Sequence, residues 1–300
     1  MSFKRTFTDK NINLMQKGIV ETTKRELVLY TYGEHYLRLD SADNATLFAL
    51  LKADVVLGNV FPAVRNDELH FYYKGGCLFK FRNGAFYRDK NYEGYSQGTE
   101  DMSTYERAKK QNENRYSKSD GEAKERQLLD ELYCHTYGEH SSSQVVVLDV
   151  EVNLKDKDGH NNKCDLVLLN TQTDELMFVE GKVYDDERVR SAVGHPPKVI
   201  GQVANYTAVI AEQSEEILAQ YCCYVEIVNT LFGTTYKPPQ RLIKCAKLLV
   251  FKTGGGVERN VRYTIDTINE QLGADNVMWV KDERPTLQEV WDALKGETCK

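Results

Sequence analysis

The sequence predicts an α/β protein whose central mixed sheet is flanked by helices and preceded by a small β-rich region. Two observations predict this class. Residues 26–91 are dense in Tyr, Phe, Leu and Val and contain hairpin signals such as Asn83-Gly84. After residue 119 a helix, three strands, a helix, a strand, a helix and a strand follow in turn. That order is typical of layered α/β domains.

The first region combines strands with one helix. ELVLYTYGEHYLRLD and ELHFYYKGGCLFKFRNGAFYRDK predict strands of an antiparallel sheet. SADNATLFALLKADVV, between them, starts with Ser, Asp and Asn and has apolar residues three to four apart, so we expect a short helix.

The change in composition between residues 95 and 121 marks a predicted domain junction, because this stretch is almost wholly polar and charged. It is either a polar linker or an exposed helix that bridges the two halves. We therefore divide the chain into a β-rich amino-terminal module (1–100), the linker or bridging helix (101–118) and a larger domain (119–300).

The larger domain begins with a predicted amphipathic helix, EAKERQLLDELYCHTY, for which Ser119-Asp120 offers an N-cap. Three strands are predicted next, QVVVLDVEVNL, CDLVLLN and ELMFVEGKVY, joined by turns rich in Gly, Asn and Asp. Residues 197–231 are predicted helical. The last elements are the strand AKLLVF, the helix VERNVRYTIDTINEQLG, the strand VMWVKD and the helix TLQEVWDALKG, capped by Thr286 or Asp282.

Composition and charge exclude several classes of protein. No run of about 18 apolar residues is present, so we expect no membrane partner. The amino terminus has no apolar block behind its basic residues, which predicts a cytoplasmic protein. Seven cysteines without C-x-x-C argue against a zinc ribbon, and we expect them to be reduced and mostly structural. A net charge of −6 argues against a protein that coats nucleic acid through a wholly basic surface.

One window carries a recognisable chemistry. Strand alternation places Glu180 and Lys182 on the same face, on either side of Gly181. If the preceding strand forms a hairpin with this one, Asp165 lies beside Glu180. Hydrolysis of a phosphodiester needs oxygen ligands that hold Mg²⁺ or Mn²⁺, and a lysine that orients water or offsets negative charge in the transition state. The predicted geometry supplies both.

Asp165 followed by Glu180-Gly181-Lys182 resembles the motif of the PD-(D/E)xK nuclease superfamily. Gln202 and Tyr206, on the helix after it, are similar to the Q-x-x-x-Y motif of the exonuclease-like branch. The resemblance covers residues 119 to 255 and implies a restriction-endonuclease-like fold.

The resemblance also implies a role for each matched residue. Asp165 and Glu180 would bind the metal, Mg²⁺ or Mn²⁺, and Lys182 would be the catalytic lysine. Gln202 and Tyr206, at positions i and i+4 of one helical face, would contact the substrate backbone or position Lys182.

Further carboxylates could complete the site. On the preceding helix Glu122, Glu125 and Glu131 compete, and we favour Glu125 because it shares the face of the buried leucines. On the first strand Glu151 is a rival, together with Asp149 on the same face; an exposed strand face is the alternative for both.

The chain departs from the family pattern at two positions. Cys164 replaces the proline before Asp165, which should affect the turn into the strand more than the metal. Gly181 replaces an apolar residue, and we expect it to weaken local packing and loosen the strand.

We therefore predict a divalent-metal-dependent nuclease. DNA is favoured over RNA because most relatives implied by the resemblance cut DNA, and roles in restriction, phage defence or DNA repair are compatible. A homodimer would suit paired cuts in a duplex. The alternative is a catalytically silent nucleic-acid-binding or regulatory protein on the same fold. The basic residues after the motif form either a groove for nucleic acid or a scattered solvated face: Lys198, Arg241, Lys244, Lys247, Lys252, Arg259 and Arg262.

Overall fold

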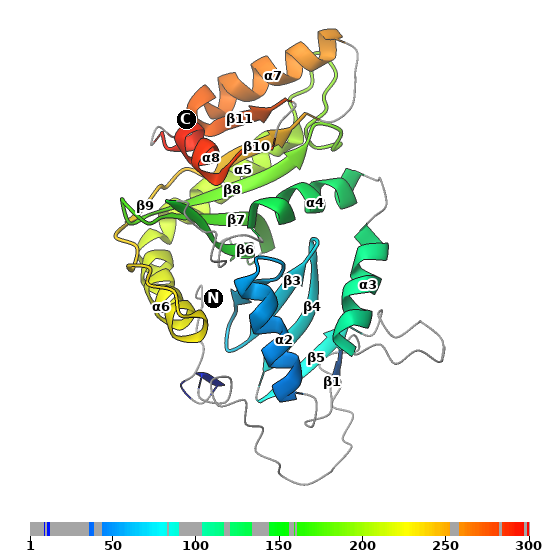
Figure 1. Cartoon of the computed structure of the whole chain (residues 1–300). Helices are drawn as coiled ribbons and strands as arrows, with labels where there is room; N and C mark the ends of the chain where they lie inside the picture. Colours follow the sequence, from blue (N-terminus) through cyan, green and yellow to red (C-terminus); the bar gives the residue numbers. More distant parts are fainter. Residues whose placement is uncertain are drawn as a thin grey trace.

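The chain is described by a computed structural model (Figure 1). It describes residues 9, 11–12, 36–38, 44–82, 84–89, 104–116, 121–133, 144–155, 159, 161–252, 258–281, 284–296 and 299. An antiparallel sheet and a mixed sheet are flanked by helices, which confirms the predicted α/β class at this level. Several predicted features lie outside the described residues: the first strand over residues 26–35, Asn83, the N-cap Ser119-Asp120 and Asp282.

The antiparallel sheet is built from the amino-terminal region and has the strand order β1-β5-β4-β3-β2. Its strands are β1 (Tyr36–Arg38), β2 (Phe61–Val64), β3 (Leu69–Tyr73), β4 (Gly76–Arg82) and β5 (Ala85–Asp89). The predicted helix is α2 (Asn44–Val56). Aromatic side chains fill the core, where the rings of Phe71, Phe79 and Phe81 lie against that of Phe86.

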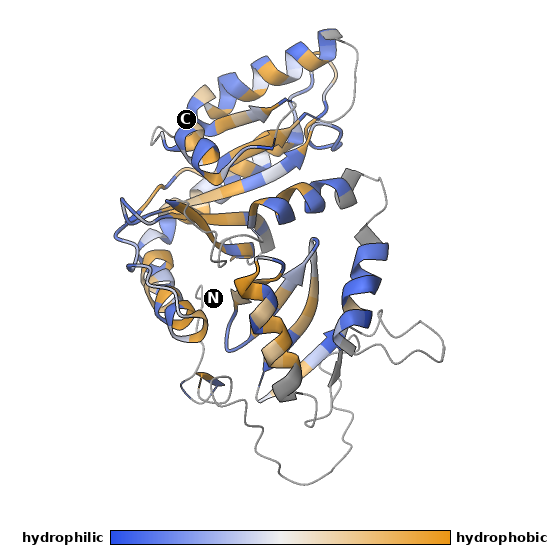
Figure 2. Ribbon diagram, in the orientation of Figure 1, coloured by the Kyte–Doolittle hydropathy of each residue, from blue (hydrophilic) through white to orange (hydrophobic). Residues whose placement is uncertain are grey.

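The polar stretch after this sheet contains helix α3 (Thr104–Tyr116), so of the two predictions for it the helix is the one observed. α3 packs against the amino-terminal sheet. The ring of Tyr105 stacks on that of Phe79, with centroids 6.2 Å apart, and the Asn112 amide donates to the carbonyl of Tyr73. Most of the coloured part of α3 is hydrophilic (Figure 2).

The turn between β3 and β4 touches helix α4 (Gly121–Tyr133) of the second half. Lys74 and Gly75 both have positive φ, as a tight hairpin turn requires. Gly75 N–H donates to Asp130 Oδ1 over 2.9 Å, and a Cβ on Gly75 would lie 2.6 Å from Arg126 Cβ. Glycine therefore allows this close approach of turn and helix.

The mixed sheet has the order β11-β10-β8-β7-β6, with the short β9 beside β8. Its strands are β6 (Val145–Lys155), β7 (Asn161–Asn170), β8 (Glu175–Val183), β9 (Arg241–Leu242), β10 (Lys247–Phe251) and β11 (Val277–Val280). β6, β7 and β8 form the predicted antiparallel meander, whereas β10 runs parallel to both β8 and β11.

Helices lie against this sheet and account for the predicted helical segments (Figure 1). They are α4, α5 (Lys198–Glu212), α6 (Ser214–Phe232), α7 (Glu258–Leu272) and α8 (Leu287–Leu294), with a 3₁₀ turn, η3 (Ala274–Asn276). Thr286 caps α8 in a capping box with Glu289, as predicted.

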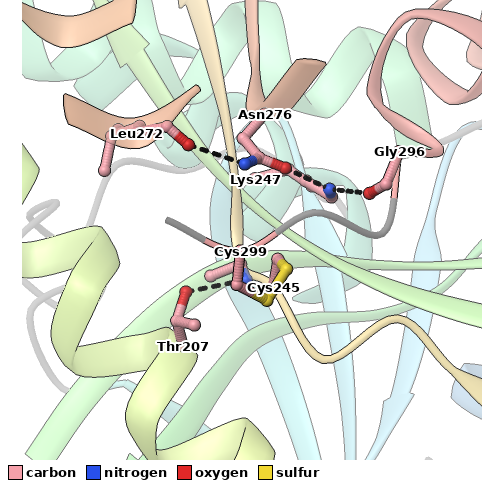
Figure 3. Close-up of a disulfide and its surroundings, with 8 residues drawn as sticks. Thr207, Cys245, Lys247, Leu272, Asn276, Gly296 and Cys299 are labelled. Atoms are coloured by element: carbon pink, nitrogen blue, oxygen red, sulfur yellow. Dashed lines mark hydrogen bonds between the residues drawn. A yellow bond between two sulfur atoms is a disulfide. The ribbon is translucent and has the colours of Figure 1, made fainter. Parts of the chain in front are cut away.

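The carboxy-terminal tail is fastened to the start of β10 (Figure 3). Cys245 and Cys299 form a disulfide, so the prediction that the cysteines are reduced is wrong for this pair. Their separation of 54 residues explains why spacing did not reveal it. Lys247 is fully buried, and its ammonium donates to Asn276 Oδ1 and Gly296 O. Lys247 is therefore a structural residue and lines no nucleic-acid groove.

Within the described part of the chain, no helix combines the length and the apolar character needed to cross a membrane.

Candidate functional site

The site forms where β7 and β8 run side by side. Leu166 pairs with Val179, which places Asp165 next to Glu180. Asp165 Oδ2 accepts a hydrogen bond of 2.9 Å from the N–H of Gly181. β7 starts at Asn161, so Asp165 lies within the strand and not at its beginning as predicted.

Cys164 belongs to the same strand. It pairs with Val152 of β6, and its buried thiol lies 3.4 Å from the carbonyl of Val179. The expectation that this cysteine affects the turn into the strand is therefore wrong, because Cys164 is a packed residue between two strands.

Lys182 is the centre of a cluster of oxygen atoms. Its ammonium lies 2.7 Å from Glu180 Oε1, 3.2 Å from Glu125 Oε1 and 3.5 Å from Asp165 Oδ2. It also donates to the carbonyl of Gly181 over 2.6 Å. The side chain of Lys182 is only 2% exposed. Three carboxylates thus share one buried ammonium, and we call these four side chains the Lys182 cluster.

Burial and the neighbouring charges shift the pKa values of the cluster. Burial opposes the charge of Lys182, but Asp165, Glu180 and Glu125 outweigh it and raise the pKa of the ammonium above its ordinary value. Burial, with Asp165 next, raises the pKa of Glu180 well above its ordinary value, and burial likewise raises the pKa of Glu125. Lys182 therefore stays protonated at neutral pH.

One carboxylate oxygen of Glu180 accepts hydrogen bonds, and the other accepts none from the described residues. Its Oε1 accepts from Lys182 and, over 2.6 Å, from Gln202 Nε2. Its Oε2 is buried and accepts no hydrogen bond from the described residues. A buried carboxylate oxygen without a partner is unfavourable in a folded protein, and a bound water or ion is one explanation for it.

Gln202 and Tyr206 of α5 both reach the site. The Gln202 side chain donates to Glu180 and lies 2.6 Å from the hydroxyl of Tyr206. The Tyr206 hydroxyl donates to the carbonyl of Lys163 over 2.7 Å. Both residues therefore reach the site, where Gln202 contacts Glu180 and neither residue is bonded to Lys182.

Glu125 is the glutamate of α4 that reaches Lys182, as favoured from the sequence. Its competitor Glu131 pairs with Arg284 over 2.7 Å. The side chain of Glu122 lies outside the described residues.

Leu129 of α4 fills the space beside Gly181, where we expected weak packing. A Cβ at this position would lie 2.5 Å from Leu129 Cδ2 of α4. The absence of a side chain allows α4 to approach β8 closely, and this approach brings Glu125 within reach of Lys182. The expected weakening of local packing is therefore wrong, and the expected loosening of the strand stays a prediction.

Glu151 and Asp149 of β6 have different surroundings. Val150 pairs with Leu166 and Val152 with Cys164, so Glu151 lies across from Asp165. Glu151 has φ +51° and pairs with Lys163 over 2.9 Å.

Asp149 has different partners from Glu151. It is fully buried and binds the guanidinium of Arg65 and the hydroxyl of Tyr221. The bulge in β6 between Val147 and Asp149 precedes both acids, and the positive φ at Glu151 is the irregularity that lies between their different partners.

A cavity of about 470 Å³ opens beside these residues. It is lined by the Lys182 cluster, Glu151, Gln202 and Tyr206, and by Gly75 of the β3–β4 turn. Three cations that sequence reasoning missed also line it: Arg126, Lys163 and Arg188. Lys163 could have been found, because it lies two residues before Asp165 on the same strand. Arg188 follows β8 in a loop, where no periodicity indicates direction.

The described residues contain no group of three or more His, Cys, Asp and Glu side chains arranged to hold a metal ion.

Comparisons of the chain with protein-family models, with curated proteins and with solved structures give no match.

Proposed function

We propose that the chain is a divalent-metal-dependent nuclease of the PD-(D/E)xK type, with a restriction-endonuclease-like fold over residues 119–300. Asp165, Glu180 and Lys182 would form its centre, and DNA is the favoured substrate. The observation that carries the proposal is the convergence of two carboxylates and one buried ammonium from adjacent strands on one cavity.

The donor atoms fit a hard divalent cation. Mg²⁺ prefers oxygen ligands, keeps several waters and is commonly bound by only one or two carboxylates. Asp165 and Glu180 supply two such carboxylates. Oε2 of Glu180, which accepts no hydrogen bond from the described residues, would be one ligand oxygen. When bound, the metal would polarise the phosphate and lower the pKa of a bound water.

The protein side chains have distinct tasks in this proposal. Lys182 carries its proton at neutral pH, so it would donate a hydrogen bond and offset negative charge at the phosphate instead of acting as a base. Gln202 would hold Glu180 through its bond to Oε1. Glu125 would hold the ammonium of Lys182 in place by accepting a hydrogen bond from it.

The test uses purified wild type, Lys182→Ala and a matched control, Lys237→Ala. Lys237 is exposed and does not line the cavity. Each protein is incubated with linear DNA, circular DNA and single-stranded RNA, in Mg²⁺, Mn²⁺ or chelator.

We expect metal-dependent cleavage by wild type and by Lys237→Ala, and a loss of about a thousandfold in Lys182→Ala. The polymer that disappears identifies the substrate. Equal cleavage by Lys182→Ala would assign the activity to a contaminant. Binding without cleavage by wild type would favour the catalytically silent binding protein.

A further inference from the structure

The loop after β8 brings a second cation to the cavity. Arg188 lines the cavity together with Asp165, Glu180 and Lys182. Its side chain is 43% exposed, whereas that of Lys182 is 2% exposed. Arg188 is therefore the more accessible of these two cations for a molecule that enters from solvent.

Asp186 holds one edge of the Arg188 guanidinium. Nε and Nη2 of Arg188 donate to Asp186 Oδ1 and Oδ2 over 2.9 and 2.5 Å. The backbone is fixed as well: the N–H of Arg188 donates to Asp186 Oδ1, and its carbonyl accepts from Val199 N–H at the start of α5. The arginine is thus positioned before any ligand binds.

The other edge of the guanidinium remains available. Nη1 of Arg188 donates to no described residue, whereas Lys163 is paired with Glu151. Arginine carries five N–H groups in a planar fork, so an arginine held by one carboxylate can still bind phosphate oxygens.

The charge of the cavity indicates what the free edge would bind. Its acidic side chains are Glu125, Glu151, Asp165 and Glu180, and these match the basic ones in number: Arg126, Lys163, Lys182 and Arg188. A nucleic-acid phosphate next to these carboxylates is repelled unless a cation with a free donor faces it.

We propose that Arg188 is a substrate-binding residue that contacts a phosphate of the nucleic-acid substrate through Nη1, with Asp186 as its positioning residue. The inference rests on the proposed function. It adds a phosphate contact that is separate from the metal ligands and from Lys182.

The test measures binding, so that it does not depend on turnover. A fluorescent DNA oligonucleotide, with or without a 5′-phosphate, is titrated by anisotropy in Ca²⁺ at several salt concentrations, and a gel checks that the probe stays intact. The variants are Arg188→Gln, Arg188→Lys and Arg190→Gln. Arg190 is the matched control, because it pairs with Asp185 in the same loop but does not line the cavity.

We expect Arg188→Gln to weaken binding roughly 10- to 100-fold, as for a charged hydrogen bond. The slope of log K against log salt should fall by about one. Arg188→Lys should keep the salt slope but recover only part of the affinity, because it retains charge without the fork. Arg190→Gln should match wild type. An effect confined to the 5′-phosphorylated probe would identify a terminal phosphate, and an equal effect on both probes a backbone phosphate.

Two results would overturn the inference. Equal affinity and equal salt slope in Arg188→Gln and Arg190→Gln would remove Arg188 from the site while leaving the nuclease proposal intact. Absence of binding by wild type, together with absence of cleavage, would overturn both. Thermal unfolding of each variant separates a loss of binding from a loss of fold.

Discussion

Two buried ionic clusters in this molecule differ in their balance of charge. Where the two sheets meet, the guanidinium of Arg65 binds Asp149 Oδ1 and the carbonyl of Val150, and the hydroxyl of Tyr221 donates to Asp149 Oδ2. One cation faces one anion, and both carboxylate oxygens are bonded. In the Lys182 cluster three carboxylates face one ammonium, and Glu180 Oε2 is unbonded.

We interpret this difference as one between a structural ion pair and the proposed functional site. A matched and fully bonded pair fixes the geometry between two elements, and Arg65 joins the β2–β3 turn to β6. The additional carboxylates of the Lys182 cluster fix no such geometry. Each buried carboxylate without its own cation raises the free energy of the folded state. Natural proteins keep destabilising groups of this kind mainly where function needs them.

The largest effect is expected for Arg65→Ala. The substitution leaves Asp149 as a buried carboxylate without a cation, so the free energy of unfolding should fall by roughly 3–5 kcal/mol. Urea denaturation followed by circular dichroism measures it.

An exposed ion pair provides the control for this first prediction. Lys295 pairs with Asp292 at the surface, and Lys295→Ala should change stability by less than about 1 kcal/mol. If Arg65→Ala does not fold, the double variant Arg65→Met with Asp149→Leu should restore folding, since it removes both charges. A loss below about 1 kcal/mol in Arg65→Ala would contradict a structural role for the pair.

Local pattern explains how much of these clusters the sequence predicts. The meander and the convergence of Asp165, Glu180 and Lys182 follow from strand alternation and one short hairpin, so the sequence predicts them. Arg65 and Asp149 are 84 residues apart in the sequence, and they meet only because β6 lies beside the β2–β3 turn. No local pattern carries that information.

Positions defined by packing between elements are also beyond sequence reasoning. From the sequence, Gly181 predicts weak packing within a strand. In the structure Leu129 occupies the space that a side chain at this position would fill. Arg188 lies in a loop, and its direction depends on Asp186 and on the start of α5. The Cys245–Cys299 disulfide depends on where the tail returns to β10.

Acid should weaken the region around Arg65. Burial, with Arg65 nearby, lowers the pKa of His70 to about 4, although the hydrogen bond to Glu68 opposes this. Because the folded-state pKa lies below the ordinary value of about 6.5, the neutral ring contributes stability above pH 6.5 that is lost as pH falls toward 4. The full difference is on the order of 3 kcal/mol.

The measurement for His70 is a set of urea denaturations between pH 4 and 8. His70→Gln should flatten the decline in stability between pH 6.5 and 4, because glutamine takes no proton. His195→Gln, at an exposed position, is the control and should leave the decline unchanged. A decline of the same size in wild type and His70→Gln would show that the ring is not buried as a neutral group.

The Lys182 cluster should respond to pH in the opposite direction, and this gives the smallest of the three effects. Burial and then Asp165 raise the pKa of Glu180, so its contribution to stability is fully present below about pH 4.3 and is lost as pH rises. Glu180→Gln resembles the protonated form. At pH 7–8 it should therefore stabilise the fold by roughly 1 kcal/mol, an advantage that disappears below about pH 4. The same variant should lose cleavage, because glutamine is a poor metal ligand.

Glu175→Gln is the matched control on the same strand: Glu175 pairs with Arg241, so its removal should bring no gain. If Glu180→Gln is less stable than wild type at pH 8, the excess of acid in the cluster is a structural feature, and the contrast with the Arg65 pair does not hold.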